Sequence, residues 1–402
     1  MCADRGASIR LGIVAGEASG DALAATLIRG VRARRSDVHF AGIAGPRMQA
    51  EGCEVWAPME RLAVRGLVEV LAHLPELFAL RRRVARRFIR EEVPVFVGVD
   101  APDFNLGLER RLKRHGVRTV HFVSPSVWAW RRERLHSIDR AVDRVLALFP
   151  FEVPLYEEAG IAVTFVGHPL AADAAGPGAR RAAREALKHK GAVPLFALLP
   201  GSRLSEIEMH AGLVLDAAAR ISEARPDARF VVPVVSRTTR DAFVEAQHRG
   251  GHDALPLTVL YGHAGDALRA ADVAMVASGT ATLEAALARC PHIIFYRVAP
   301  LTAAIVLRKL LVPWVGLPNV LAGRFVVPEF LQEQATPANL ARAALNLFDD
   351  TVTRRRLENL FGDFGRRLAV DTGVLASEAV LSELARASIA SAAARRPQRR
   401  AA

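Results

Sequence analysis

Short apolar runs rich in β-branched residues recur along the chain, and segments with helical spacing of apolar residues separate them. An apolar run without a polar face predicts a strand that is buried on both sides of its sheet. Strands that alternate with helices predict a parallel sheet covered by helices on both faces. In the first part of the chain the predicted strands are residues 9–15, 39–43, 93–99, 118–123, 145–149 and 163–166.

The alternation stops once and then starts again. The interval 170–191 is polar and rich in Ala, Gly and Arg, and it predicts a linker. Two doubly wound, Rossmann-like α/β halves that face a central cleft follow from this pattern. In such sheets, ligands bind outside the carboxyl ends of the strands. After the interval the predicted strands are residues 195–199, 229–235, 257–260, 273–277 and 292–296.

The length and hydropathy of the chain predict two folded domains and no membrane-spanning helix. The chain has 402 residues, of which 51% are hydrophobic, enough for two cores. Residues 62–80 and 301–317 are the most apolar stretches, but both contain charged side chains. Each is therefore predicted to be a core or interfacial helix. The first residues lack the apolar segment of a signal peptide.

The net charge indicates the kind of partner, and the cysteine content indicates whether disulfides or a zinc site are present. The formal net charge of +12 favours an anionic partner such as a nucleic acid, a phosphorylated ligand or an acidic membrane. Cys2, Cys53 and Cys290 are isolated from one another in the sequence, which argues against a disulfide framework or a zinc site.

The first candidate loop, GEASGD, follows the strand at 9–15. Gly16 and Gly20 permit tight turns, and the next helix offers free backbone N–H groups. An ordinary strand-to-helix turn, capped by Ser19 or Asp21, explains the loop equally well. Glu17 favours a functional role, because such a turn does not need a glutamate.

The second candidate loop, LLPGSRLSEIE, follows the strand at 195–199. Gly201 and Ser202 can bring backbone N–H groups close to a phosphate, and Arg203 can bind it with two parallel hydrogen bonds. Ser205 and Glu208 match a capping box and predict the helix start. The alternative for Arg203 is a surface ion pair.

The third candidate loop lies in ASGTATLEAALA. Small residues with free N–H groups at Ser278, Gly279 and Thr280 suit a phosphate, and Glu284 suits a ribose diol. Alternatively, Ser278 or Thr282 only caps the helix, and Glu284 complements its dipole.

The fourth candidate loop, VGVDAPDFN, places Asp100 and Asp103 at the end of a buried strand. Pro102 disfavours helical geometry at Ala101, so the strand is predicted to end in an extended turn. Paired carboxylates at a strand end suggest a general base and a second carboxylate that positions it. Alternatively, Asp103 is only the N-cap of the next helix.

Seven strings occur together and in order: GEASGD, VGVDAPDFN, SPSVWAWR, FVGHPL, LLPGSR, SGTATLEAAL and LPNVLAGR…VPEFLQEQ. This set resembles the bacterial lipid-A-disaccharide synthase family, which are inverting glycosyltransferases of the GT-B fold. The resemblance spans residues 9–385, and SPSVWAWR and LPNVLAGR are its most specific parts.

The resemblance implies a reaction in lipid A biosynthesis. The donor would be UDP-2,3-diacylglucosamine and the acceptor 2,3-diacylglucosamine 1-phosphate. The products would be the β-1′,6-linked disaccharide 1-phosphate and UDP. No cofactor and no metal are expected, since GT-B enzymes stabilise the leaving diphosphate with side chains and helix N-termini.

The resemblance also implies roles for single residues. Asp103 matches the general base toward the acceptor 6-hydroxyl, Asp100 a neighbour that orients it, and Glu17 a carboxylate near the reacting sugars. Arg203 and the 278–280 loop match contacts to the donor diphosphate, and Glu284 a ribose or uridine contact. The full set of expected substrate-binding residues is Gly16, Ser19, Gly20, Ser126, Trp128, Gly201, Ser202, Arg203, Ser278, Gly279, Thr280, Glu284, Asn319, Glu329 and Gln332.

The family architecture implies an acceptor and membrane-side domain at 1–169, completed by C-terminal helices at about 370–390. A UDP-sugar domain is expected at 170–369 and a disordered basic tail at 391–402. The chain departs from its relatives at Val298 and Ala299, where they often have Met-Lys, at Ala335, where cysteine is common, and at Pro94, where some have an acidic residue. These departures concern details of the donor site rather than the reaction.

Both expected substrates carry acyl chains and phosphate, so we expect a peripheral enzyme on the cytoplasmic face of the inner membrane. Residues 62–80 offer apolar area, and the arginine-rich segment 81–90 beside them offers cationic charge. The alternative is a core helix followed by a solvated basic helix. A homodimer is possible.

Two other functions compete with this interpretation. A UDP-sugar 2-epimerase would share the donor-type loops, but it needs no lipid surface. A nucleic-acid binder would explain the basic charge, but the arginines lack interleaved aromatic residues. We therefore expect no nucleic-acid partner.

Overall fold

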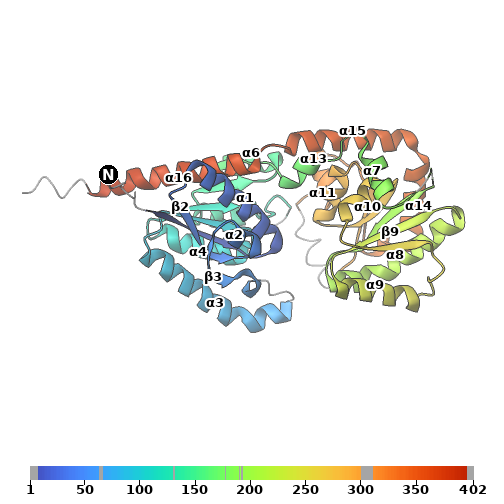
Figure 1. The fold of residues 1–402 in the computed structure, drawn as a ribbon, viewed down its shortest axis with the longest axis horizontal. Coiled ribbons are helices and arrows are strands. Elements are labelled where there is room, and N and C mark those ends of the chain that lie inside the picture. The colour runs from blue at the N-terminus through green and yellow to red at the C-terminus, as the bar shows by residue number, and fades with distance from the viewer. Residues whose placement is uncertain are drawn as a thin grey trace, which may run out of the picture. The chain divides into compact units, whose positions relative to one another are not determined.

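The computed structural model describes residues 8–62, 67–129, 132–176, 178–189, 191, 193–299 and 311–395, without the side chains of 67–73 and 391–395. The chain divides into two compact units (Figure 1). Unit 1 comprises residues 1–169 and 370–402, and unit 2 comprises residues 170–369.

Within its described residues, unit 1 is built on a seven-stranded sheet in the order β3-β2-β1-β4-β5-β6-β7. Every neighbouring pair of strands is parallel. The strand order reverses between β1 and β4, where Ala15 pairs with Val99. The strands are β1 (Ile9–Ala15), β2 (Val38–Ala44), β3 (Glu54–Pro58), β4 (Val95–Val99), β5 (Arg118–Phe122), β6 (Arg144–Ala147) and β7 (Val163–Phe165).

Helices cover both faces of this sheet. Alternating residues of β4 separate two cores: Val95, Val97 and Val99 pack with α1 and α16, and Phe96 packs with α3 and α4. The helices are α1 (Ala18–Arg34), α2 (Pro46–Ala50), α3 (Leu67–Arg90), α4 (Pro102–Lys113), α5 (Arg134–Asp139), α6 (Val153–Glu158) and α16 (Thr372–Arg395), with 3₁₀ turns η1 (Met59–Arg61) and η2 (Pro150–Glu152).

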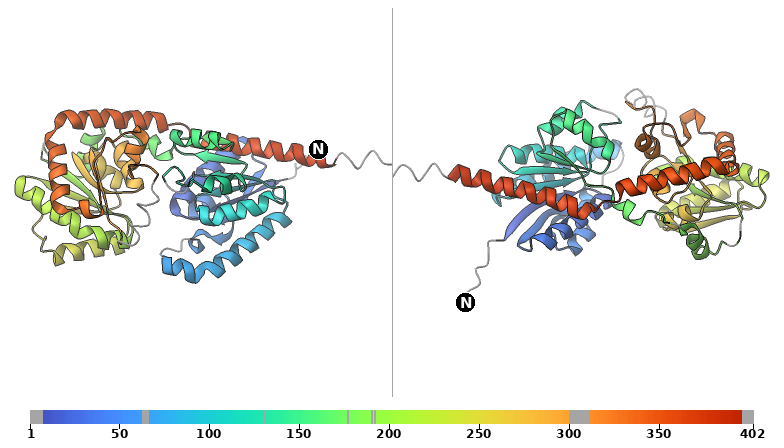
Figure 2. Two further views of the ribbon diagram at one scale, coloured as in Figure 1. Left: turned by 180° about the vertical axis from the view of Figure 1, so that it is seen from behind. Right: turned by 90° about the horizontal axis from the view of Figure 1, so that it is seen from above.

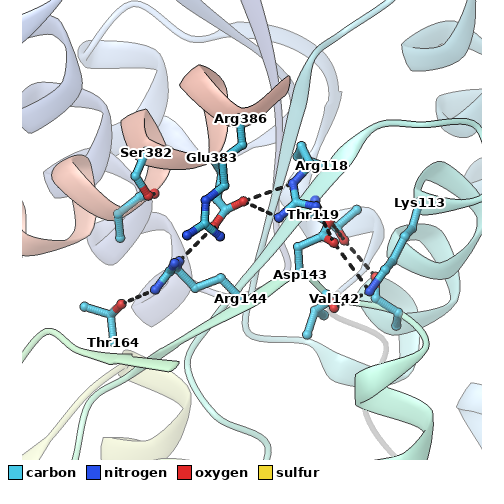
Figure 3. A network of polar contacts seen from close by, with 12 residues as sticks. Lys113, Arg118, Thr119, Val142, Asp143, Arg144, Thr164, Ser382, Glu383 and Arg386 are labelled. Atoms are coloured by element: carbon cyan, nitrogen blue, oxygen red, sulfur yellow. Dashed lines mark hydrogen bonds and ion pairs between the residues drawn. The ribbon is translucent and has the colours of Figure 1, made fainter. Parts of the chain in front are cut away.

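The last helix, α16, completes unit 1 although it comes from the end of the chain. It lies beside α1 in the views of Figures 1 and 2. Figure 3 shows how the buried Glu383 of α16 binds the N-terminal ends of two strands: Arg118 Nη2 donates to its Oε2 at 2.5 Å, and Arg144 Nε donates to its Oε1 at 3.0 Å. These charge-assisted bonds tie α16 to β5 and β6.

Unit 2 repeats the architecture with a six-stranded sheet in the order β10-β9-β8-β11-β12-β13, counted over its described residues. The strand order reverses between β8 and β11, where Leu199 pairs with Val276. The strands are β8 (Leu195–Leu199), β9 (Arg229–Val234), β10 (Leu257–Tyr261), β11 (Val273–Ala277), β12 (His292–Tyr296) and β13 (Glu329–Leu331). The helices are α7 (Ala179–Ala186), α8 (Leu204–Ala224), α9 (Arg237–Arg249), α10 (Ala264–Ala270), α11 (Thr280–Leu287), α13 (Leu317–Ala322), α14 (Pro337–Asp349) and α15 (Thr351–Leu368), with 3₁₀ turns η3 (Pro169–Asp173) and η4 (Gln332–Gln334).

The structure confirms two doubly wound α/β domains and corrects several expected elements. The predicted linker contains helix α7, because the alanines and arginines of 179–186 favour helix once one face packs on α10. Helix α3 continues through Pro75, although proline usually kinks or ends a helix. Helix α16 extends to Arg395, so residues 391–395 are not part of a disordered tail. The rest of that predicted tail, and most of the apolar stretch 301–317, lie outside the described residues.

Candidate functional site

The candidate site of unit 1 lies where the strand order reverses. The register Val14–Gly98 and Ala15–Val99 places the loops after β1 and β4 side by side. A side chain at Gly16 would put its Cβ only 2.7 Å from the Cβ of Ala101, closer than two carbon atoms can approach. Gly16 therefore allows the two loops to touch, and it brings Glu17 and Asp100 into one region.

The backbone after β4 is strained rather than extended. Asp100 and Ala101 have φ angles of 53° and 44°, so the predicted extended turn is wrong. Left-handed geometry at two consecutive residues other than glycine costs on the order of 1–3 kcal/mol each. Tertiary bonds hold it: Asp100 N donates to Phe122 O at 2.8 Å, and Asn105 Nδ2 donates to Asp100 O at 2.8 Å. The surrounding fold thus imposes the direction of the Asp100 side chain.

The two aspartates occupy different environments. The Asp103 side chain, in the first turn of α4, is 87% exposed and forms an ion pair with Arg134 Nη2 at 2.9 Å. Asp100 is half-buried. Burial, reinforced by the nearby Glu17 carboxylate, raises the pKa of Asp100 above its usual value, against an opposing effect of the Ala101 N–H and His121.

A pocket of about 360 Å³ brings these carboxylates together with apolar side chains. Glu17, Asp100 and Asp103 line it from the two loops. Helix α3 contributes an apolar wall on the other side and one cation, Arg81. The remaining lining residues are Gly16, Leu62, Leu74, Leu77, Phe78, Ala101, Pro102 and Phe104. A pocket of this composition suits a sugar that carries acyl chains.

A buried polar pair lies behind the Asp100 loop, and we did not predict it from the sequence. His121 of β5 and Glu109 of α4 are both fully buried, with Nδ1 and Oε1 2.7 Å apart. Gly98 provides the space, because a Cβ there would lie 2.2 Å from Glu109 Oε1. The only sequence signal is a glutamate and a histidine at positions whose spacing faces the core.

The first loop differs from its predicted capping. Helix α1 begins at Ala18, and Glu17 is its N-cap residue without a side-chain cap bond. Asp21 is buried and accepts hydrogen bonds from the backbone N–H groups of Gly45, Arg47 and Met48, so it caps α2 instead of α1. Ser19 is exposed in the first turn, and Gly20 is buried against β4.

The loop after β5, which contains Ser126 and Trp128, lies beside a buried acid, Glu152. Burial raises the pKa of Glu152 to about 8, although hydrogen bonds from the Phe149 and Leu148 backbone, Ser124 and Trp128 oppose the shift. Trp128, an expected substrate contact, is half-buried and packs edge-on against Phe151. Ser126 is exposed.

In unit 2, the loop after β8 is organised by Glu206. Its Oε2 accepts hydrogen bonds from the backbone N–H groups of Ser202 at 2.8 Å and Arg203 at 3.2 Å. Helix α8 begins at Leu204, so the predicted Ser205–Glu208 capping box is wrong; Ser205 lies inside the helix. The Arg203 side chain is 55% exposed, and its Nη1 lies 3.7 Å from Glu206 Oε1, which is too long for a hydrogen bond. Most of its N–H donors are therefore free.

His210 was also missed, and it fixes the same loop. The ring is buried, with Nδ1 2.8 Å from Pro200 O. Nε2 accepts from Arg297 N at 3.1 Å, so the proton resides on Nδ1 and is donated to Pro200 O. One imidazole therefore links the loop after β8 to the chain after β12.

The loop after β11 opens onto solvent. Gly279 has φ 148°, a conformation that L side chains rarely adopt, and nothing lies within 4 Å of a Cβ placed there. Gly279 and Thr280 are exposed at the start of α11, and Ser278 is half-buried. Glu284 is half-buried one turn later, and burial raises its pKa. Among the described residues no hydrogen-bond or ion-pair partner faces its carboxylate.

Three expected donor-site residues form hydrogen bonds within the described part of the protein and do not point free polar atoms toward a ligand: Asn319, Glu329 and Gln332. Asn319 is fully buried and bonds to Val326, Val327 and Glu329. Glu329 accepts from the N–H groups of Val315 and Gly316, both at 2.9 Å. The Gln332 amide pairs with the backbone of Val298. These residues fasten the segments around β13, and direct contacts to a substrate are not required to explain them.

Comparison with known proteins identifies the family. The model of the lipid-A-disaccharide synthetase family matches residues 11–369. The lipid-A-disaccharide synthase of Chromobacterium violaceum is 50% identical over 382 residues, which cover 95% of this chain and 99% of that protein. The synthase of Pseudomonas aeruginosa PAO1 is 48% identical, covering 93% and 97%.

The chain belongs to the lipid-A-disaccharide synthetase family.

Solved structures show that the family fold here is the GT-B fold. Anabaena HepE in complex with UDP and glucose aligns with a TM-score of 0.55 at 13% identity, covering 94% of this chain and all of that chain. The calicheamicin glycosyltransferase CalG4 aligns with a TM-score of 0.59 at 15% identity, covering 94% and 99%. A putative UDP-N-acetylglucosamine 2-epimerase from Listeria monocytogenes shares the fold at 13% identity, TM-score 0.60, covering 93% and 95%.

Membership of the lipid-A-disaccharide synthetase family decides between the functions left open by the sequence. The likeness to the epimerase is one of fold alone, whereas the synthases match in sequence over nearly the whole chain. The protein is therefore an enzyme, a glycosyltransferase of lipid A biosynthesis. In the part of the chain that the structure describes, no helix has the length and hydropathy of a membrane span.

Proposed function

We propose that this enzyme transfers the diacylglucosamine unit of UDP-2,3-diacylglucosamine to the 6-hydroxyl of 2,3-diacylglucosamine 1-phosphate. The products are UDP and the β-1′,6-linked disaccharide 1-phosphate. Family membership supports the reaction class. The observation that carries the proposal is the unit 1 pocket, because it combines carboxylates with an apolar wall. An acylated sugar needs both surfaces at once.

Unit 1 would hold the acceptor and supply the base. The acceptor oxygen bonds to C1 of the donor sugar as the bond from C1 to the diphosphate oxygen breaks. The electron pair of that bond leaves with UDP, and the hydroxyl proton passes to a carboxylate. Attack on the face opposite UDP inverts the configuration at C1.

The structure favours Asp100 over Asp103 as this base. From the sequence we predict Asp103, but its carboxylate is exposed and paired with Arg134. Asp100 lies in the pocket, is held in a fixed direction, and has a pKa raised by burial. We therefore propose Asp100 as the base, Glu17 as the carboxylate beside it, and Asp103 with Arg134 as a positioning pair.

Unit 2 would hold the donor. Free backbone N–H groups at the start of α11, together with Arg203, can stabilise the leaving diphosphate. Glu284 lacks a polar partner among the described residues, so it remains available for the ribose diol. Asn319, Glu329 and Gln332 would act indirectly by holding the neighbouring chain.

The enzyme would work as a peripheral protein at the cytoplasmic face of the inner membrane. In α3, Phe78 is 48% exposed, and Arg82, Arg83 and Arg86 are exposed next to it. Apolar area beside cationic charge suits an anionic lipid surface. Arg87 differs from the other arginines, because it pairs with Glu54 and Glu91 and stacks on Trp56.

An assay of UDP release tests the proposal. We expect release only when both acylated sugars are present in detergent micelles. An unacylated acceptor or donor should reduce the rate strongly, because the apolar wall of the pocket would lose its partner. UDP release without any acceptor, or equal rates with unacylated sugars, would contradict the proposal.

A further inference from the structure

The acceptor pocket contains one cation whose purpose the reaction above does not explain. Arg81 of α3 lines the pocket beside Asp103 and Phe78. Its side chain is half-buried, and burial together with the neighbouring Arg82 lowers its pKa. Among the described residues no carboxylate lies within ion-pair distance of it. Its closest polar contact is a long one, 3.5 Å from Nη1 to the backbone O of Asp103.

The position of this guanidinium is nevertheless fixed by its surroundings. Its Cζ lies 4.8 Å from the centre of the Phe78 ring, so the aromatic face supports one side of the cation. On the other side, a Cβ at Gly107 of α4 would lie 2.3 Å from Nη1. The guanidinium therefore occupies a notch that the missing side chain of Gly107 leaves in α4. Its N–H donors remain largely unpaired.

A fixed, half-buried guanidinium with free donors is suited to a phosphate. Arginine presents N–H groups in a planar fork that matches two phosphate oxygens, and the pairing is stronger away from bulk water. The same pocket holds the carboxylates that would face the acceptor hydroxyl. A ligand that places a hydroxyl at Asp100 and an anionic group at Arg81 would satisfy both ends of the pocket.

We propose that Arg81 binds the phosphate group of the acceptor sugar and thereby selects phosphorylated acceptors. This inference rests on the proposed function, since it assigns the acceptor to the unit 1 pocket. The apolar residues of α3 would contact the acyl chains, and Arg81 would set the direction in which the sugar enters. Gly107 is then a positioning residue, because it leaves room for the guanidinium.

The test compares two acceptors in neutral detergent without phospholipid: 2,3-diacylglucosamine 1-phosphate and the same sugar without phosphate. We expect the parent enzyme to prefer the phosphorylated acceptor in kcat/KM. Arg81→Gln should reduce that preference by a factor on the order of ten or more, mainly through KM of the phosphorylated acceptor. Arg81→Lys should be intermediate, since a point charge replaces the fork.

Two further variants separate binding from folding. Gly107→Ala keeps the charge but displaces the guanidinium, so the preference should fall although alanine favours a helix. Arg110→Gln, at an exposed site of α4, removes a charge outside the pocket and should leave the preference unchanged. An unchanged preference in Arg81→Gln would overturn the proposal. So would a change confined to the binding of phospholipid vesicles, which would assign Arg81 to a membrane headgroup.

The outcomes also distinguish this inference from the proposed function. If the parent enzyme releases UDP with the acylated sugars but Arg81→Gln retains the preference, only the role of Arg81 is wrong. If the parent releases no UDP with either acceptor, the proposed reaction itself fails.

Discussion

Nδ1 of His121 and Oε1 of Glu109 lie 2.7 Å apart in the core of unit 1, and neither side chain reaches solvent. Burial lowers the pKa of His121, but the Glu109 and Asp100 carboxylates together raise it by more, so its net pKa lies above the ordinary value. A buried charge that loses its partner is costly, whereas removal of both partners is often tolerated.

We therefore expect Glu109→Leu and His121→Leu each to lower the free energy of unfolding by about 3–5 kcal/mol, and the double variant to lose less than their sum. Urea unfolding of the four proteins measures this. Glu245→Leu breaks an exposed pair with Arg249 and should cost no more than about 1 kcal/mol. Additive losses at Glu109 and His121 would show that the two side chains are not coupled.

The identity of the base can be read from two isosteric variants. Asp100→Asn should lower kcat by roughly 10²–10⁴-fold while UDP affinity survives, because the amide cannot accept the proton. Asp103→Asn should cost less, since its main partner is Arg134. The raised pKa of Asp100 also means that kcat/KM falls with decreasing pH at a higher pH than for an ordinary aspartate. If Asp103→Asn were inactive and Asp100→Asn active, Asp103 would be the base, as predicted from the sequence.

Much of the fold follows from the sequence because its strands are buried on both faces. Leu195–Leu199 and Val273–Ala277 have the predicted bounds, and every residue in them is buried. Strands β3 and β13 were missed because they lie at sheet edges and are only partly buried, with glutamates inside their bounds. Apolar periodicity is weak in such strands.

The site follows from the sequence only in part. The reversal of strand order explains why the loops after β1 and β4 meet, and sequence alternation predicts both loops. Local patterns cannot show that Asn319 and Glu329 bond to each other, or that Asp21 caps a distant helix. Each of these bonds depends on residues that approach only when the chain folds.

Glu152 makes the stability of unit 1 depend on pH. Its pKa is about 8 in the folded state against an ordinary value of 4.5, so the folded state binds the extra proton between these values. Stability is therefore lost as pH rises through this window, by up to roughly 1.4 kcal/mol for each pH unit. As pH rises from 5 to 8, the free energy of unfolding of the parent should fall, whereas that of Glu152→Gln should not fall for this reason. Urea unfolding should therefore show the variant becoming more stable relative to the parent over this range. A constant difference between the two proteins would show that Glu152 is ionised when folded.

The proposed membrane-binding surface of α3 can be tested with substitutions that leave the fold intact. Arg82, Arg83 and Arg86 are exposed, so their replacement by Glu should reduce binding to anionic vesicles by at least about tenfold at low salt. Arg87 must be left intact, because its ion pair with Glu54 ties α3 to strand β3. The same charge change at three exposed arginines of α15 is the matched control: Arg355, Arg356 and Arg367. Equal losses in both triple variants would indicate a general charge effect rather than a surface on α3.

Arg203 should matter for the donor and not for the acceptor. Its guanidinium is exposed, lies before the first turn of α8, and is 3.7 Å from the nearest carboxylate oxygen of Glu206, so it is free to bind a diphosphate. Arg203→Ala should raise the activation free energy by about 2–3 kcal/mol, seen as a fall in kcat/KM for the UDP-sugar.

Arg203→Ala should affect the kinetic parameters of the donor but not those of the acceptor, and this difference tests the role of Arg203. UDP affinity should fall as well, whereas KM for the acceptor should stay within a few-fold of the parent. Arg220→Ala, at an exposed position on the same helix, changes the charge equally and should leave both parameters unaltered. Because Glu206 also caps the loop through the N–H groups of Ser202 and Arg203, the alanine variant keeps those backbone bonds. An unchanged kcat/KM for the UDP-sugar would therefore exclude Arg203 from diphosphate binding without any appeal to misfolding.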